Sequence, residues 1–389
     1  SIFKYSSFVG KADEPGSRDG LGEAARFSSP LYITEYLQGS MLVADRNSHT
    51  IKIILSDGTV DTALGQAFQC GENEGKHEDV RICEPQNIAV DMETGNVFWS
   101  RDRRIYAYDA DADYVSLIFN GESTTGWIGG LGFMNGDLYF TDQDKHTLNK
   151  LSWNGSSFDK SLVAGVENQA KQGYIDNWAT TTSFDEISFN RPSHVTPDPA
   201  NNRLFIGFGY WNWYDWDQKG RIFVVDLDTN TVSELETLRR FLSELSPRGN
   251  VEFGKPGIDS SGNLYIPTTN GGNTVVKVGF NDDGTFDGVK STISDDKINN
   301  PQSVAVAGGS LYIANMNSYT VDKVNLGASI EIPAMQVTNN ITLSAFKDPF
   351  FEEDEVMDVN VASLTNATSA DTEVADVTII ESTRLTLVE

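Results

Sequence analysis

The chain has 389 residues, with 29 Lys and Arg against 56 Asp and Glu, and a formal net charge of -27. It is long enough to bury a substantial core, and its acidic surface repels nucleic acid and anionic lipid but suits cations such as Ca²⁺. No apolar run approaches the ~18 residues of a membrane-spanning helix, so neither nucleic-acid binding nor direct membrane insertion is expected.

The first residues predict a strand. The chain begins at Ser1 without an initiator methionine or a signal-like segment, which is typical of a mature or excised piece. Residues 2–10, "IFKYSSFVG", then alternate apolar and polar side chains and end in glycine. This pattern indicates a single β-strand that needs a partner elsewhere in the chain.

A hairpin pattern then recurs along the chain. It is clearest in "MLVADRNSHTIKII" (41–54), "LYFTDQDKHTLNKL" (138–151), "LYIPTTNGGNTVVKV" (264–278) and "LYIANMNSYTVDKV" (311–324). Each copy is an apolar strand, a polar turn, then Thr, an aliphatic residue and a second strand carrying Lys. Two further copies, 95–109 and 202–226, have a shorter and a longer turn. Each segment is predicted to be a β-hairpin.

Most hairpins are preceded by another apolar strand, which is often introduced by proline, as in "SPLYIT" and "NPQSVAVA". Several are followed by a fourth strand, as in "TVDTALG" and "YVSLIFNG". Six units of about four strands predict an all-β fold, a six-bladed β-propeller. The sixth unit lacks a fourth strand, so we expect residues 2–10 to supply it and to close the ring.

The segment "GLGEAARFSSPLYI...MLVADRNSHTIKII" (20–54) resembles an NHL repeat, which couples G-x-G, an Arg-Phe-x-x-Pro turn and V-A-D-x-x-N. The resemblance is close in the first copy, partial in the third and sixth, and covers residues 1–328 overall. It implies a propeller whose loops bind proteins, RNA or small ligands, and a few relatives are lyases. RNA-binding members use a basic face, which argues against that role for this acidic chain.

Residues 329–389 follow a different pattern. Their alternating strands around "VMDVNVASLTNAT" resemble the second half of a Calx-β domain, a β-sandwich. The first half is not visible, so we expect this partial sandwich to be completed by another chain or domain, or to pack on the propeller. The resemblance implies a slice of a longer secreted or surface protein.

Cys70 and Cys83 are the only cysteines, and a short polar segment separates them. Two neighbouring cysteines favour a disulfide over a pair of reduced thiols, and therefore an oxidising, extracellular compartment. Such a bridge would stabilise the fold by about 3 kcal/mol.

The hairpin turn of the fourth unit is unusually aromatic. It reads "GYWNWYDWDQKG" (209–220), and the long connection before that unit contributes Trp178. Clustered rings beside Asp and Asn are suited to stacking on a glycan or to a protein contact. The alternative is that these rings cap the core of the propeller. The candidate ligand-binding residues are Tyr210, Trp211, Trp213, Tyr214, Trp216 and Trp178.

The histidines offer no zinc site. His49 and His146 occupy a turn position that is Tyr319 or Asn273 in other copies, and only His194 falls on an inner strand. A calcium-dependent lactonase-like hydrolase or a lyase, with its site on the central axis, remains the alternative to a binding protein. No G-x-S-x-G sequence is present, and no cysteine lies beside a plausible base.

The best candidate metal site lies in the acidic run "DPFFEEDE" (348–355). Hard Ca²⁺ requires several carboxylate oxygens that converge from a short segment. The resemblance to the Calx-β acidic run strengthens this reading over a solvated charged turn. The candidate ligands are Asp348, Glu352, Glu353, Asp354 and Glu355.

The sequence therefore predicts a non-catalytic extracellular or cell-surface module for binding and adhesion, with a glycan or a protein as its partner. The partial sandwich would contact neighbouring subunits or domains of the same larger assembly, and strand exchange there could build a filament.

Overall fold

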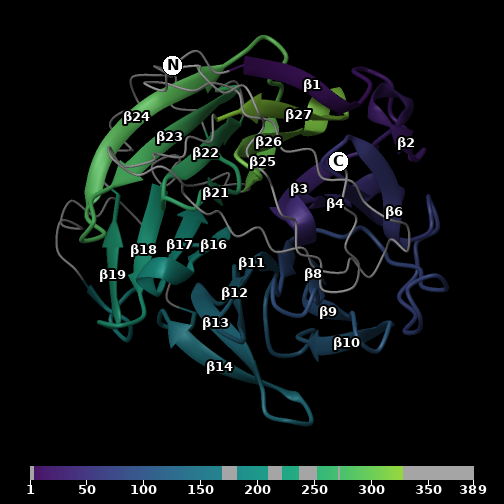
Figure 1. Ribbon diagram of the computed structural model, residues 1–389. Coiled ribbons are helices and arrows are strands. Elements are labelled where there is room, and N and C mark those ends of the chain that lie inside the picture. Colours follow the sequence, from purple (N-terminus) through teal and green to yellow (C-terminus); the bar gives the residue numbers. More distant parts are fainter. Residues whose placement is uncertain (1–3, 169–181, 209–220, 236–251, 270–271, 327–389) are drawn as a thin grey trace, which may run out of the picture. The chain divides into compact units, whose positions relative to one another are not determined.

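The described residues form one propeller. The computed structural model describes residues 4–168, 182–208, 221–235, 252–269 and 272–326, all within one compact unit, Ser1–Ala328. Six antiparallel sheets are arranged as blades around a central axis (Figure 1), which confirms the predicted all-β, six-bladed β-propeller. In this part of the chain, no helix is both long and apolar enough to cross a membrane.

Each blade is ordered from an inner strand at the axis to an outer strand at the rim. Blade 1 contains β3 (Pro30–Glu35), β4 (Met41–Asp45), β5 (Thr50–Ile54), β6 (Thr59–Gly65) and, outermost, β2 (Gly20–Leu21). Blade 2 contains β7 (Ile88–Val90), β8 (Val97–Arg101), β9 (Arg104–Asp109) and β10 (Tyr114–Asn120). Blade 3 contains β11 (Ile128–Met134), β12 (Asp137–Asp142), β13 (Thr147–Trp153) and β14 (Phe158–Ala164).

The remaining three blades follow the same plan. Blade 4 contains β16 (Val195–Asp198), β17 (Arg203–Phe208), β18 (Arg221–Asp226), β19 (Thr231–Glu234) and, outermost, β15 (Thr182–Ser183). Blade 5 contains β21 (Gly257–Ile258), β20 (Glu252–Phe253), β22 (Leu264–Thr269), β23 (Thr274–Phe280) and β24 (Phe286–Ser294). Blade 6 contains β25 (Pro301–Ala307), β26 (Ser310–Asn315), β27 (Thr320–Asn325) and, outermost, β1 (Lys4–Gly10).

The N-terminal strand closes the ring. β1 pairs antiparallel with β27, from Lys4 opposite Asn325 to Gly10 opposite Thr320 (Figure 1). The Tyr5 hydroxyl also donates a hydrogen bond to the buried carboxylate of Asp322. The first and last strands of the propeller therefore lie in one sheet, and no open edge separates blade 6 from blade 1.

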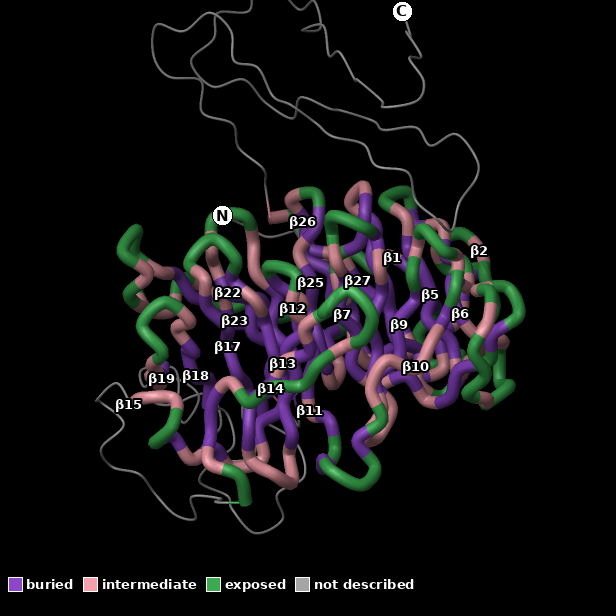
Figure 2. The backbone as a smooth tube through the Cα atoms, turned by 90° about the horizontal axis from the view of Figure 1, so that it is seen from below, coloured by how far each residue is buried: buried purple, intermediate pink, exposed green. Residues whose placement is uncertain are grey.

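The core lies between neighbouring blades. Both faces of the middle strands are apolar because each sheet packs against a sheet on either side; β4 and β5 are buried along their whole length. Phe27 and Met41 of blade 1, for example, pack in one cluster with Ala314 and Val321 of blade 6. Figure 2 shows these buried strands between exposed loops.

Glycines let blades 3 and 4 approach closely. A Cβ atom on Gly130 would lie 2.2 Å from the Ser193 carbonyl oxygen, and one on Gly129 would lie 2.5 Å from the carbonyl oxygen of Pro192. The "WIGGLGF" segment of blade 3 therefore has glycines where other blades have side chains.

In blades 1, 3 and 5, the turn between the second and third strands is hydrogen-bonded to the segment that enters the next blade. His49 and His146 adopt left-handed backbone conformations, with φ of 59° and 62°. Their Nδ1 atoms accept hydrogen bonds from the main-chain N–H of Glu84 and Arg191, each at 3.1 Å. In blade 5 the Asn273 Oδ1 atom accepts the equivalent bond from Asn300, at 3.0 Å. The predicted turn position thus fixes the chain where it enters the next blade.

The last residue of the second strand has a related role. Asp45 is fully buried and accepts hydrogen bonds from the N–H groups of Ser28 and Ser29, at 2.9 and 2.6 Å, and from the Ser48 hydroxyl at 2.6 Å. Both carboxylate oxygens of Asp142 accept a hydrogen bond from the main-chain N–H of Gly126, each at 3.0 Å. The acidic end of the V-A-D pattern therefore holds the segment that leads into its own blade.

Candidate functional site

A cavity of about 800 Å³ opens on the central axis. The described residues that form its walls come from blades 1, 2, 3, 4 and 6. The walls consist of residues at the start of the inner strands and residues in the turns between the second and third strands. We call this end of the propeller the cavity face. A volume of this size is ordinary for a small-ligand site.

The lining is rich in amides and aromatic rings. It includes the amides Asn47, Gln86, Asn87, Gln143, Gln302 and Asn317, with the rings of Tyr32, Trp127 and Tyr319. Trp127 is 42% exposed, so its ring is accessible at the mouth. Among the described residues that line the cavity, Arg46 carries a charge, His194 is the one imidazole, and none is a carboxylate.

Strand register identifies one equivalent position in every blade near the axis. On each inner strand, one residue pairs with the middle of the second strand; Ile33 pairs with Val43 in blade 1, and Val304 pairs with Ile313 in blade 6. The equivalent position is the residue immediately before it. The six residues at this position are Tyr32, Asn87, Gly130, His194, Lys255 and Ser303. We call them the axial ring. It contains no acidic residue.

His194 lines the cavity and carries an unpaired acceptor. The side chain is buried, lies edge-on to the Tyr32 ring with centroids 5.7 Å apart, and its Nδ1 atom has no hydrogen-bond partner among the described residues. Burial, and next the positive charge of Lys255, lower the pKa of His194 to about 4, whereas a main-chain hydrogen bond with Phe253 opposes this. The imidazole is therefore neutral at pH 7, and Nδ1 offers a lone pair.

Asn87 presents a second acceptor. Its amide nitrogen donates to Ser100 Oγ at 2.9 Å and to the Ile128 carbonyl oxygen at 3.1 Å, which fixes the orientation of the amide. Its Oδ1 atom is buried and has no partner in the described part of the chain. Because buried polar atoms are nearly always hydrogen-bonded, two free acceptors in the lining of one cavity point to a ligand or to ordered water.

Lys255 spans the central axis next to His194, whose pKa its charge lowers. From blade 5 its Nζ atom donates a 3.0 Å hydrogen bond to the carbonyl oxygen of Ile88, in the opposite blade 2. The residue is 8% exposed, and none of the described acidic side chains forms an ion pair with it. Burial lowers its pKa to about 8, so the ammonium still predominates at pH 7.

Lys255 is the site residue that the sequence did not identify. In blade 5 the proline stands after the axial-ring position, at Pro256, whereas in blade 6 Pro301 precedes it. The sequence signal that could have identified Lys255 is the second strand "LYIPTT" of blade 5. The inner strand precedes the second strand in every blade, so the preceding segment "GKPGI" is expected at the axis. Asp259, in the following turn, accepts hydrogen bonds from the main-chain N–H groups of Ser261 and Asn263 and so stabilises that turn.

Within the described ranges, no three His, Cys, Asp or Glu side chains are grouped closely enough to hold a metal ion. The carboxylates that an axial calcium site requires are not part of the cavity lining described above. The predicted calcium ligands, Asp348, Glu352, Glu353, Asp354 and Glu355, lie outside the described residues.

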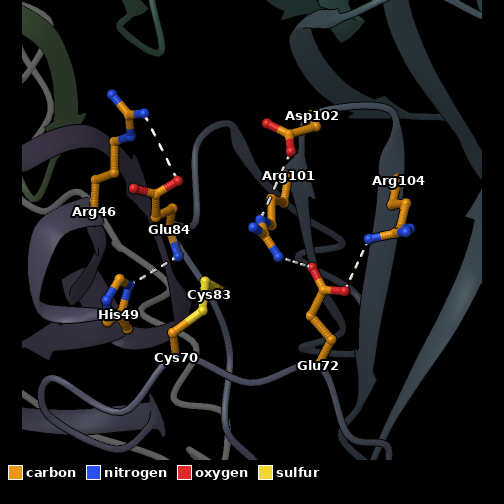
Figure 3. Close-up of a disulfide and its surroundings, with 9 residues drawn as sticks. All are labelled: Arg46, His49, Cys70, Glu72, Cys83, Glu84, Arg101, Asp102 and Arg104. Atoms are coloured by element: carbon orange, nitrogen blue, oxygen red, sulfur yellow. Dashed lines mark hydrogen bonds and ion pairs between the residues drawn. A yellow bond between two sulfur atoms is a disulfide. The ribbon is translucent and has the colours of Figure 1, made fainter. Parts of the chain in front are cut away.

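The predicted disulfide is present. Cys70 and Cys83 are bonded, with their Cα atoms 4.4 Å apart (Figure 3). The loop that they close bears Glu72, which contacts Arg101 and, at 2.8 Å, Arg104 of blade 2. The bridge and these ion pairs hold the connection from blade 1 against blade 2.

The predicted aromatic residues, Tyr210, Trp211, Trp213, Tyr214, Trp216 and Trp178, also lie outside the described residues. The residues that flank the aromatic turn are described. Phe208 ends β17 and Arg221 begins β18. The corresponding ends in blade 6 flank Met316, Asn317 and Tyr319, which line the cavity. Phe208 and Arg221 therefore lie at the cavity-face end of blade 4.

Comparisons with known proteins show the fold alone. No protein-family model and no curated protein matches the chain. Among similar solved structures, a Bacteroides thetaiotaomicron protein of unknown function is 14% identical, with a TM-score of 0.53, over 83% of this chain and 76% of that one. A catalytically inactive virginiamycin B lyase from Staphylococcus aureus, with quinupristin, is 11% identical, with a TM-score of 0.50, over 84% of this chain and all (100%) of that one.

Proposed function

We propose that this chain is a non-catalytic extracellular binding module and that its cavity face binds a glycan. The observation that carries the proposal is the lining of the axial cavity, where amides and aromatic rings from blades 1, 2, 3 and 6 surround a space of about 800 Å³. Amides orient sugar hydroxyls, and flat rings stack on the apolar faces of sugars with little loss of side-chain entropy.

The sequence adds a second aromatic element to this face. Phe208 and Arg221, the strand ends that bound the sequence segment with Trp211 and Trp213, belong to the cavity face. The proposal assigns rings of that segment, together with the accessible Trp127 of blade 3, to one extended ligand. A protein partner would use the same rings as anchors and is the other outcome of the test.

The disulfide supports an extracellular location, because such bonds persist in oxidising compartments. The NHL type of the repeats and the Calx-β-like nature of residues 329–389 are part of the proposal and rest on sequence patterns. So does Ca²⁺ binding by the acidic run 348–355, which would stabilise contacts with neighbouring domains of an adhesive assembly.

The rival function is a calcium-dependent hydrolase or a lyase with an axial site. The donor set in the cavity favours binding, because it combines one neutral imidazole with amides and no carboxylate among the described lining residues. A lactonase of the calcium type would need convergent acidic ligands there.

The proposal is tested on a glycan array with the full chain, with and without calcium, using Trp127→Ala and the double variant Trp211→Ala, Trp213→Ala. Loss of a stacking ring should weaken binding by roughly 30-fold. The matched control is Trp153→Ala. Trp153 is 56% exposed but ends β13, at the opposite end of its blade from the cavity face.

Binding should therefore survive in the Trp153 variant and be lost in the other two. If no glycan binds and a protein ligand is captured through the same tryptophans, the glycan assignment is wrong. If the tryptophan variants bind every glycan as well as the natural protein does, the cavity face is not the binding surface.

A further inference from the structure

Asn87 and His194, which we call the floor of the axial cavity, carry two buried acceptors that no described residue satisfies. His194 Nδ1 and Asn87 Oδ1 lack hydrogen-bond partners among the described residues, and both side chains are at least nine-tenths buried, with exposures of 4% each. Both line the same cavity. Leaving such atoms unpaired is unfavourable, so the floor favours a ligand that donates hydrogen bonds to it.

Four kinds of group could satisfy these acceptors: a hydroxyl, an amide N–H, an ammonium or a metal cation. The positive charge of Lys255 disfavours the two cationic groups, the ammonium and the metal cation, relative to the two neutral ones. Its ammonium lies across the axis, bonded to Ile88 of the opposite blade, and the axial ring supplies no acidic side chain to neutralise it. A second positive charge at the floor would be repelled in a partly desolvated setting, where such repulsion is strong.

An anion is disfavoured for a different reason, although the charge of Lys255 attracts it. A carboxylate or sulfate in contact with His194 Nδ1 and Asn87 Oδ1 would place its lone pairs against theirs. The donors of the Asn87 amide are already used by Ser100 and Ile128. The floor therefore selects neutral donors, although the chain as a whole is strongly acidic and attracts cations.

We propose that this floor is a subsite for a neutral sugar hydroxyl, which donates to His194 Nδ1 or Asn87 Oδ1, and that Lys255 excludes cationic groups from it. The inference rests on the proposed glycan binding and names the class of glycan. A neutral sugar suits the rest of the cavity, because Trp127 offers a stacking face at the mouth and rim amides such as Gln86 can contact further hydroxyls.

The probes are four immobilised sets of oligosaccharides: neutral hexoses, N-acetylhexosamines, free amino sugars and uronic acids. The full natural chain should bind one or both neutral sets at least about tenfold more tightly than the amino sugars and uronic acids, at pH 7. Lys255→Met keeps the volume of the floor and removes its charge. It should raise affinity for amino sugars and leave that for the neutral sets within about threefold.

His194→Phe keeps a ring but removes the acceptor, so it should weaken neutral-sugar binding by about tenfold or more. His194→Gln restores a side-chain acceptor and should recover part of that loss. The matched control is His146→Asn, in a histidine outside the cavity lining, because Asn273 makes the same turn contact in blade 5. Thermal melting of each variant separates loss of binding from loss of folding.

The outcomes are distinct. If neutral glycans bind and the His194 variants, still folded, bind equally well, the subsite is wrong while glycan binding stands. If amino sugars or uronic acids bind the natural protein as tightly as neutral sugars, the selectivity is wrong. If no set binds, the subsite and the proposed function both fail.

Discussion

Replacement of Asp45 by Ala should destabilise the propeller strongly. The buried carboxylate accepts hydrogen bonds from the N–H groups of Ser28 and Ser29 and from the hydroxyl of Ser48. Burial raises the pKa of Asp45, and these hydrogen bonds, which favour its ionised form, act against that shift. Alanine would leave three donors without their acceptor and remove the tether of the chain that enters blade 1.

Hydrogen bonds to a charged group contribute about 1.5–3 kcal/mol each, and the part-exposed Ser28 can be solvated instead. The free energy of unfolding should therefore fall by roughly 3–5 kcal/mol. Asp45→Asn keeps one acceptor oxygen. Because Asn315 fills this position in blade 6 and accepts a 3.1 Å bond from Asn299, this change should cost only about 1–2 kcal/mol.

The assay is urea unfolding followed by tryptophan fluorescence. Asp111→Ala is the control, because Asp111 is exposed in a turn and should change the unfolding free energy by less than about 0.5 kcal/mol. An Asp45→Ala protein as stable as this control would show that the carboxylate does not hold the connection, and the account of the repeat would be wrong.

Three further predictions concern the ring and its loops. Burial raises the pKa of Asp322 to about 6, so the folded state holds that proton more tightly than the unfolded chain does. The natural protein should lose up to about 3 kcal/mol of stability relative to Asp322→Asn as the pH rises from about 4 to 7, and a flat difference in unfolding free energy would refute this. Converting Cys70 and Cys83 to Ser should lower the unfolding free energy by about 2–3 kcal/mol, and an unchanged urea midpoint would show that the loop is held by its ion pairs alone. His146→Ala should cost about 1–2 kcal/mol in the same assay, and equal stability of the Ala and Asn variants would contradict the inter-blade tether.

The sequence predicted the blades because their signals are local. Strand alternation and turn residues mark each hairpin, and the unpaired N-terminal segment matched the strand missing from blade 6. The disulfide followed from the proximity of Cys70 and Cys83. These features depend on near neighbours in the chain, where periodicity is informative.

The candidate site was harder to predict, because it depends on which residues of separate blades share one level on the axis. His194 could be placed on an inner strand, but nothing in the sequence showed that its Nδ1 would lack a partner. Lys255 was hidden by the displaced Pro256, and its contact with Ile88 joins residues 167 positions apart. Contacts of that kind follow from register and ring closure, not from local pattern.

The pairing of Lys4 with Asn325 also determines how the propeller bears load. Because β1 and β27 are antiparallel, the chain arrives at and leaves the rim of blade 6 at the same end of that pair. Tension between the two flanking segments would act on the Lys4–Asn325 pair first and open the ladder one pair after another, rather than shearing all of its hydrogen bonds together. We therefore expect stretching to act first on blade 6 and to release β1 before the other blades open.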